Sequence, residues 1–229
     1  QEYGHHASFV MFALGNELSG DFEVMQSLVN TFRQADCRHL YAYGSNNYLG
    51  FKGQLPGEDY LVTCRIGGEK PQSLDTHVRG SFSFADAYDG GYLNHTYPNT
   101  VMDFSGAVAR ADVPVVSHET GQFQVYPDYR EIAKYTGVLY PYNMEVFRDR
   151  LARAGMSEQA EDFFLASGRW AAELYKADIE MDLRTEGLAG FQLLDLQDYP
   201  GQGSAYVGIL DAFMDSKGLV SPERWRGFC

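Results

Sequence analysis

Hydrophobic and polar residues follow one another along this chain in blocks, in the repeated order strand, polar turn, helix. The first block is the run Phe9 to Leu14, which is continuously apolar and therefore predicts a strand buried on both faces. Gly15 ends the run, and Ser19-Gly20-Asp21 offers a helix start. Apolar residues then recur at helical spacing from Phe22 to about Ala35. The pattern predicts a strand, a turn and a helix.

Similar blocks recur along the rest of the chain. Further strands are predicted over His39 to Tyr43, Tyr60 to Ile66, Pro114 to His118 and Ala189 to Leu194. Helices are predicted over about Asp103 to Ala111, Asn143 to Ala154 and Ser157 to Leu183, where Ser157-Glu158 is a capping pattern, and from Ser221-Pro222-Glu223 onward. The recurring order predicts an α/β architecture with a parallel sheet.

The segment from Gly67 to Asn99 does not follow the repeated order of strand, turn and helix. It is rich in Gly, Ser, Asp, Tyr and His, has weak periodicity, and is longer than a passive connector should be. Long irregular segments of this kind usually carry function. We therefore expect residues of this segment to contribute to a site.

Composition narrows the class of protein. The formal net charge is −13, from 31 acidic and 18 basic residues without a basic cluster, which argues against nucleic acid or anionic lipid as a partner. No apolar run approaches the roughly 20 residues of a membrane span. The three cysteines, Cys37, Cys64 and Cys229, are widely spaced and are interpreted as free thiols.

Metal and nucleotide cofactors are not predicted. The six histidines are dispersed and form no HxxxH or HxH pair with carboxylate support. Gly201-Gln202-Gly203 lacks the third glycine and the helix start of a dinucleotide-binding loop, so it is interpreted as a turn. The expected chemistry therefore depends on side chains alone.

Two glutamates stand out because each follows a predicted buried strand. Glu17 ends the first apolar run, and Glu119 ends the run that starts at Val113, 102 positions later than the first. A parallel barrel brings the ends of all its strands to one rim, so both carboxylates would meet there. Paired carboxylates cleave glycosidic bonds, and retaining enzymes hold them about 5 to 5.5 Å apart. For either glutamate alone, a solvated loop carboxylate is the more common explanation.

Weaker candidates follow other strands or lie in the long polar segment. Asn46 and Asn47 end a strand, where amides could bind sugar hydroxyls, although turn-forming asparagine explains them as well. One tyrosine of the long segment is expected to hydrogen-bond Glu119, and the sequence does not choose among them. The tyrosines of that segment are Tyr88, Tyr92 and Tyr97, of which Tyr97 is also a substrate-binding candidate. The remaining substrate-binding candidates are His118, Gln122, Asp198 and Gln202.

The motifs around the two glutamates resemble glycoside hydrolase family 2. Gly15-Asn16-Glu17 after Met-Phe-Ala-Leu, with His6 to Val10 before it, resembles the acid/base signature at the end of the fourth barrel strand. Pro114 to Gln122 resembles the nucleophile strand, the seventh, and Gly190 to Asp195 resembles the eighth. The resemblance implies that residues 1–229 are the C-terminal portion, about strands 4 to 8, of a (β/α)8 TIM barrel. Its first strands, and the β-sandwich domains usual in the family, would precede this sequence in the same chain.

The resemblance also implies an activity. On this resemblance the protein would be a retaining exo-β-glycosidase, similar to a β-galactosidase or β-glucuronidase. It would remove terminal β-linked sugars and need no cofactor. Glu17 would be the general acid/base, Glu119 the nucleophile, and Asn16 a hydrogen-bond partner of the sugar 2-hydroxyl. The stretch Leu194 to Asp198 lacks the tryptophan that many relatives have there, so the sugar is left open. The alternatives are an endo-acting barrel glycosidase on polysaccharide and a non-catalytic carbohydrate-binding barrel.

Overall fold

The computed structural model describes residues 2–45, 53–66, 76–80, 99–200 and 206–229. The chain divides into two compact units. Unit 1 comprises Gln1–Thr120 and Met181–Gln192, and unit 2 comprises Gly121–Glu180 and Leu193–Cys229. The predicted α/β content is confirmed, since the described residues contain helices and two small parallel sheets.

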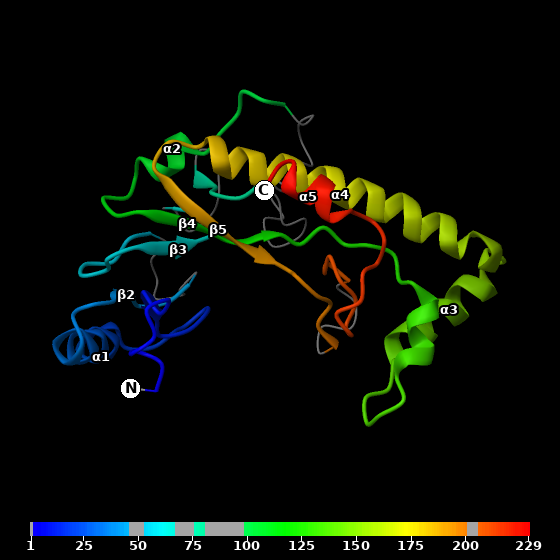
Figure 1. The fold of residues 1–229 in the computed structure, drawn as a ribbon, viewed down its shortest axis with the longest axis horizontal. Coiled ribbons are helices and arrows are strands. Elements are labelled where there is room, and N and C mark those ends of the chain that lie inside the picture. Colours follow the sequence, from blue (N-terminus) through cyan, green and yellow to red (C-terminus); the bar gives the residue numbers. More distant parts are fainter. Residues whose placement is uncertain (1, 46–52, 67–75, 81–98, 201–205) are drawn as a thin grey trace. The chain divides into compact units, whose positions relative to one another are not determined.

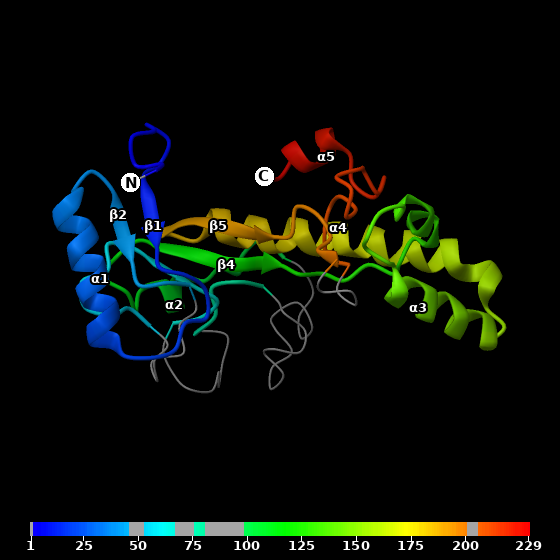
Figure 2. The same ribbon diagram turned by 90° about the horizontal axis from the view of Figure 1, so that it is seen from below.

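Unit 1 begins with the predicted strand, turn and helix. Strand β1 (Met11–Ala13) pairs in parallel with β2 (Leu40–Ala42), with Met11 opposite Leu40. Helix α1 (Phe22–Ala35) starts after Asp21, whose carboxylate accepts a hydrogen bond from Glu23 N at 2.8 Å and caps the helix. Figures 1 and 2 show α1 alongside the β1–β2 pair. Both ends of this helix agree with the prediction.

The prediction that the first apolar run is buried on both faces is wrong. Val10 is 54% exposed and Met11 is 40% exposed. Phe12 and Leu14 pack against a core cluster that includes Val29 of α1, and Ala13 packs on a second cluster. Val10 and Met11 precede both clusters, so the described residues cover only the second half of the run.

The remaining strands of unit 1 follow in order. Strand β3 (Leu61–Thr63) pairs in parallel with β4 (Val115–Gly121), and β5 (Leu188–Leu194) lies on the other side of β4. A parallel bridge between Ser45 and Val62 joins the end of β2 to β3. Figures 1 and 2 draw β4 and β5 running in the same direction. Successive strands of the chain are therefore neighbours, as they are in a (β/α)8 barrel.

One short helix accompanies these strands. Helix α2 (Ser105–Val108) lies inside the predicted helix Asp103 to Ala111 and covers only its central turn. Phe104 N, at its start, donates to Thr185 Oγ1 at 3.0 Å. This contact ties α2 to the segment that leads into β5.

Unit 2 is mainly helical. Its elements are the 3-10 helix η3 (Tyr129–Lys134), helix α3 (Tyr142–Arg153), the 3-10 helix η4 (Ser157–Gln159), helix α4 (Ala160–Arg184), whose last residues belong to unit 1, and helix α5 (Pro222–Arg226). Ser221 caps α5 as predicted, accepting a hydrogen bond from Arg224 N at 3.2 Å. The capping role predicted for Ser157 is wrong, because Ser157 is already inside the turn of η4 and Met156 occupies the cap position.

A tyrosine of α4 organises the centre of unit 2. The Tyr175 hydroxyl donates to Val207 O at 2.6 Å, and its ring meets Phe123 edge-on at 5.1 Å between ring centroids. Gly121 has a φ of 103°, and a Cβ there would lie 2.1 Å from Tyr175 Cε1. Residue 121 therefore has to be glycine for this tyrosine to pack where it does.

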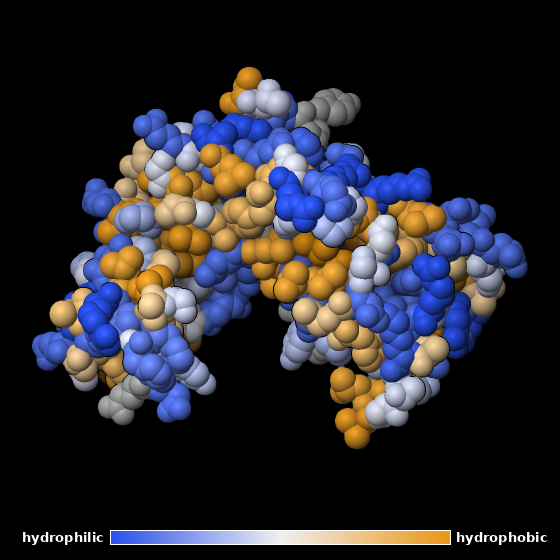
Figure 3. All heavy atoms as spheres, viewed as in Figure 1, coloured by the Kyte–Doolittle hydropathy of each residue, from blue (hydrophilic) through white to orange (hydrophobic). Residues whose placement is uncertain are grey.

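The loop before α3 exposes apolar side chains. Figure 3 shows hydrophobic spheres at its tip, where Val138 and Leu139 are exposed together with Tyr140.

Among the described residues, no helix is both long enough and apolar enough to cross a bilayer.

Candidate functional site

The end of β1 is fixed by backbone contacts to the segment after β2. Ser45 N donates to Gly15 O at 2.9 Å, and Glu17 N donates to Ser45 O at 2.8 Å. Asn16 and Ser45 form a parallel bridge that continues the register of the β1–β2 pair beyond Ala13 and Ala42. The turn that carries Asn16 and Glu17 is therefore held on both sides by the neighbouring strand.

A histidine from β4 connects to this turn. Nε2 of His118 lies 2.8 Å from Asn16 Oδ1, and Nδ1 lies 2.8 Å from Oε1 of Gln192 on β5. The ring is largely buried between the ends of three strands. Because Asn16 precedes Glu17 and His118 precedes Glu119, this hydrogen bond brings the two predicted motifs together within unit 1.

The carboxylate of Glu119 has a nitrogen near each oxygen. Arg79 Nη1 donates to Oε2 at 3.4 Å and to the backbone oxygen of Glu119 at 3.1 Å, and His118 Nε2 lies 3.6 Å from Oε1. The Arg79 side chain is 3% exposed, whereas the Glu119 side chain is 20% exposed. The carboxylate is therefore held from the protein side and still accessible from outside.

Both glutamates lie on unusual backbone. Glu17 has a φ of 51° and Glu119 a φ of 55°, and Gln122 follows with 62°. Such left-handed conformations cost a non-glycine residue of the order of 1–3 kcal/mol and tend to cluster at functional sites. Within the described residues, only Met214 shares this property among residues other than glycine. Strain therefore marks the same positions that the sequence motifs select.

The other predicted site residues belong to unit 2 or are not described. Gln122 belongs to unit 2, where its N–H donates to Leu194 O at 2.8 Å. Asp198 is buried in unit 2, forms an ion pair with Lys217 at 2.7 Å and accepts from Gly208 N, so its carboxylate is engaged within the protein. The candidates that lie outside the described residues are Asn46, Asn47, Tyr88, Tyr92, Tyr97 and Gln202.

Arg79 is the residue of this site that sequence reasoning missed. It follows a short antiparallel pairing in which Ile66 N donates to Thr76 O and Val78 N donates to Cys64 O. That pairing folds the chain back along the end of β3 and delivers Arg79 to the end of β4. The sequence signal was weak, since it amounted to one arginine within a polar segment for which function was expected in general.

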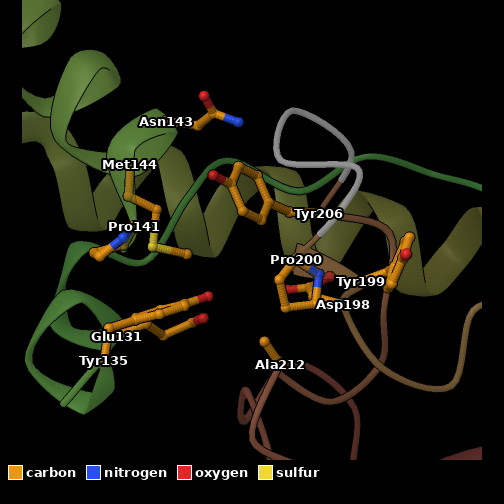
Figure 4. A pocket seen from close by; sticks show the side chains of 10 residues that line it. All are labelled: Glu131, Tyr135, Pro141, Asn143, Met144, Asp198, Tyr199, Pro200, Tyr206 and Ala212. Carbon is orange, nitrogen blue, oxygen red and sulfur yellow. The ribbon is translucent and has the colours of Figure 1, made fainter. Parts of the chain in front are cut away.

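Unit 2 contains a second group of acidic residues around a small cavity of about 40 Å³. Glu131 and Asp198 line it together with Tyr135, Met144 and Tyr206, as Figure 4 shows. Burial raises the pKa of Glu131 to about 7, and the nearby Asp198 carboxylate adds to the effect. Within the described part of the chain, Glu131 Oε2 has no hydrogen-bond partner. A space of this size holds a few water molecules.

The described residues offer no cluster of three or more His, Cys, Asp or Glu side chains that could hold a metal ion. Comparison of the chain with protein-family models and with curated protein sequences gives no match.

Proposed function

We propose that this chain is the C-terminal portion of a (β/α)8 barrel that hydrolyses β-glycosidic bonds. Five strands that follow one another in space as they do in sequence, together with the neighbouring parallel pairings, support the barrel. A closed barrel has eight strands, so the first three would precede this sequence, together with any β-sandwich domains.

One observation carries the functional proposal, namely the 2.8 Å hydrogen bond between Asn16 and His118. It joins the residues that directly precede Glu17 and Glu119, although they are 102 positions apart. The left-handed backbone at both glutamates adds independent support. Glycoside hydrolysis requires two carboxylates near one another, and this hydrogen bond brings together the residues that precede the two glutamates.

The proposed reaction has two steps. In the first, a Glu119 oxygen attacks the anomeric carbon, the bond to the leaving oxygen breaks, and the Glu17 carboxyl gives its proton to that oxygen. In the second, the Glu17 carboxylate takes a proton from water as the water oxygen attacks the anomeric carbon. The ester bond to Glu119 then breaks, and the sugar leaves with its original configuration.

Arg79 has a clear role in this scheme. Its guanidinium orients the Glu119 carboxylate through Oε2, which leaves Oε1 to attack. An arginine that also holds the Glu119 backbone oxygen fixes the residue at two points. Positioning of this kind supplies a large share of the rate in covalent catalysis.

The first test uses the full-length protein and a panel of aryl β-glycosides. Wild-type enzyme should release the phenol from at least one of them, and the panel identifies the sugar. Glu119→Ala should abolish turnover, and added azide should restore phenol release and give the glycosyl azide of inverted configuration. Unchanged turnover by this variant would rule out Glu119 as the nucleophile.

A second measurement separates this function from its alternatives. A 2-deoxy-2-fluoro aryl glycoside of the preferred sugar should inactivate the enzyme and leave a glycosyl group on the peptide that carries Glu119. A non-catalytic carbohydrate-binding barrel would bind the sugar without labelling. An endo-acting enzyme would cleave a polysaccharide internally and leave monosaccharide aryl glycosides untouched.

A further inference from the structure

His118 is engaged on both sides of its ring, which leaves the imidazole little opportunity to contact a substrate. We propose that His118 is a positioning residue, which fixes the amide of Asn16 so that its NH2 group faces the sugar 2-hydroxyl. The inference rests on the proposed function, because the sugar contact of Asn16 belongs to it. It assigns to His118 an indirect role in place of the direct substrate contact expected from sequence.

The hydrogen bond itself fixes the amide. In the arrangement described, Asn16 Oδ1 lies 2.8 Å from His118 Nε2 and can only accept, so Nε2 donates to it. Turning the amide by 180° would place its NH2 against this N–H, and two donors would oppose each other. Asn16 is exposed, so the NH2 group on its other side remains available for a ligand.

Gln192 keeps the ring in place in either protonation state. Its amide lies 2.8 Å from Nδ1 and can present its oxygen to an Nδ1–H or its NH2 to a bare Nδ1. The charged groups near the ring are Glu119, 3.6 Å from Nε2, and Arg79, which donates to the backbone oxygen of His118 at 3.5 Å. Asn16 keeps this orientation in every ring state in which Nε2 carries a proton.

The consequence is a chain of contacts across three strands. Gln192 on β5 holds His118 on β4, and His118 holds Asn16 after β1. The fixed amide would raise kcat/KM for substrates that have a 2-hydroxyl. It would not change kcat/KM for substrates that lack this hydroxyl. His118 would therefore act on selectivity at the sugar 2-position without touching the sugar.

Two substitutions of His118 separate its two hydrogen bonds. His118→Gln places an amide nitrogen near the position of Nε2 and keeps a donor to Asn16. His118→Asn is shorter, keeps a polar atom near Nδ1 for Gln192, and loses the contact with Asn16. The two variants are matched in chemistry and differ in which neighbour they reach.

The test compares kcat/KM for an aryl glycoside and its 2-deoxy analogue in the full-length enzyme. His118→Asn should lower kcat/KM about tenfold for the 2-hydroxy substrate and leave the 2-deoxy substrate within about twofold. His118→Gln should keep most of the wild-type preference. Equal losses on both substrates would overturn the inference, because a merely structural role would affect both alike.

A spectroscopic measurement separates this inference from the proposed function. The side-chain NH2 signals of Asn16, assigned with Asn16→Asp, should move in His118→Asn and stay close to wild type in His118→Gln. Unmoved signals in His118→Asn would overturn the inference whatever the turnover. If the wild-type enzyme hydrolysed no glycoside, the proposed function would fail and so would the role at the 2-hydroxyl, while these signals would still report the contact.

Discussion

Glu119 in unit 1 and Glu131 in unit 2 are two carboxyl groups in opposite situations. Glu119 is partly accessible, lies on left-handed backbone and has Arg79 at one oxygen. Glu131 is 4% exposed and lines a small cavity, and its pKa is raised to about 7. A perturbed pKa is a common guide to active sites, and here it selects the second carboxyl group.

Glu58 shows that a raised carboxyl pKa is not confined to Glu131. It is a loop residue of unit 1 whose oxygens accept hydrogen bonds from Tyr43 N at 3.2 Å and Leu55 N at 3.0 Å. Burial raises the pKa of Glu58 to about 7 as well. In this chain a raised carboxyl pKa accompanies burial, whereas backbone strain and convergent partners accompany the strand ends.

The largest difference in kcat is expected between two variants, in which Glu119 or Glu131 is replaced by glutamine. Glu119→Gln removes the nucleophile and should lower kcat on aryl glycosides by about 10⁴-fold or more. Glu131→Gln keeps size and polarity and should leave kcat within about twofold. Steady-state kinetics on both variants would contradict the comparison if Glu131→Gln were the more damaging.

The next effect concerns the ion pair beside Glu131. Lys217→Met leaves Asp198 as an uncompensated buried charge and should lower the free energy of unfolding by about 3–5 kcal/mol. The control is Lys176→Met, which removes a partly exposed pair with Glu180 and should cost about 0.5 kcal/mol. Urea unfolding at pH 7 measures both, and equal losses would show that the Asp198 pair is no more important than a surface pair.

The pH dependence of stability should sharpen the contrast. The pKa of Glu131 rises from 4.5 to about 7 on folding, so between these pH values the folded state holds a proton that the unfolded state has lost. Stability from this group is full below about pH 4.5 and is lost as the pH rises through 7, by roughly 3 kcal/mol. Glu131→Gln should flatten this slope in urea unfolding between pH 4.5 and 7.5, and an unchanged slope would contradict the assignment.

The smallest effect is expected at Arg79. Arg79→Lys keeps the positive charge but replaces a planar group, which reaches the carboxylate and backbone oxygens of Glu119 together, with a single ammonium. We expect kcat to fall about tenfold with KM nearly unchanged. Arg33→Lys, at the exposed pair with Asp59, is the matched control and should leave kcat unchanged. A fall in kcat no larger than that of the control would remove Arg79 from the proposed mechanism.

Local features of the fold could be predicted from sequence. The bounds of α1 and the cap of α5 follow from Asp21 and Ser221, because capping and amphipathic spacing act over a few residues. The exposure of Met11 could not be predicted, since it depends on which distant side chains reach the strand. Sequence patterns indicate which secondary structure a segment prefers. They do not indicate which of its side chains distant residues will cover.

The site shows the same division. Glu17 and Glu119 could be found because each follows an apolar run, but the contact between Asn16 and His118 joins residues 102 positions apart. Arg79 reaches Glu119 after an antiparallel pairing for which the sequence has no periodic signal. Asp198 follows a strand as a site residue would, and its burial with Lys217 depends on a loop partner that spacing does not specify.

The left-handed backbone at Glu17 and Glu119 lowers the stability of the fold, although the proposed reaction needs both side chains. Glycine would adopt both conformations without strain, so replacing either glutamate by glycine would relieve the fold of a conformational penalty. Selection for stability alone would therefore tend to remove these two carboxylates. A relative of this chain that kept the strands and carried glycine at both positions would be the more robust protein, and it would have lost the proposed reaction.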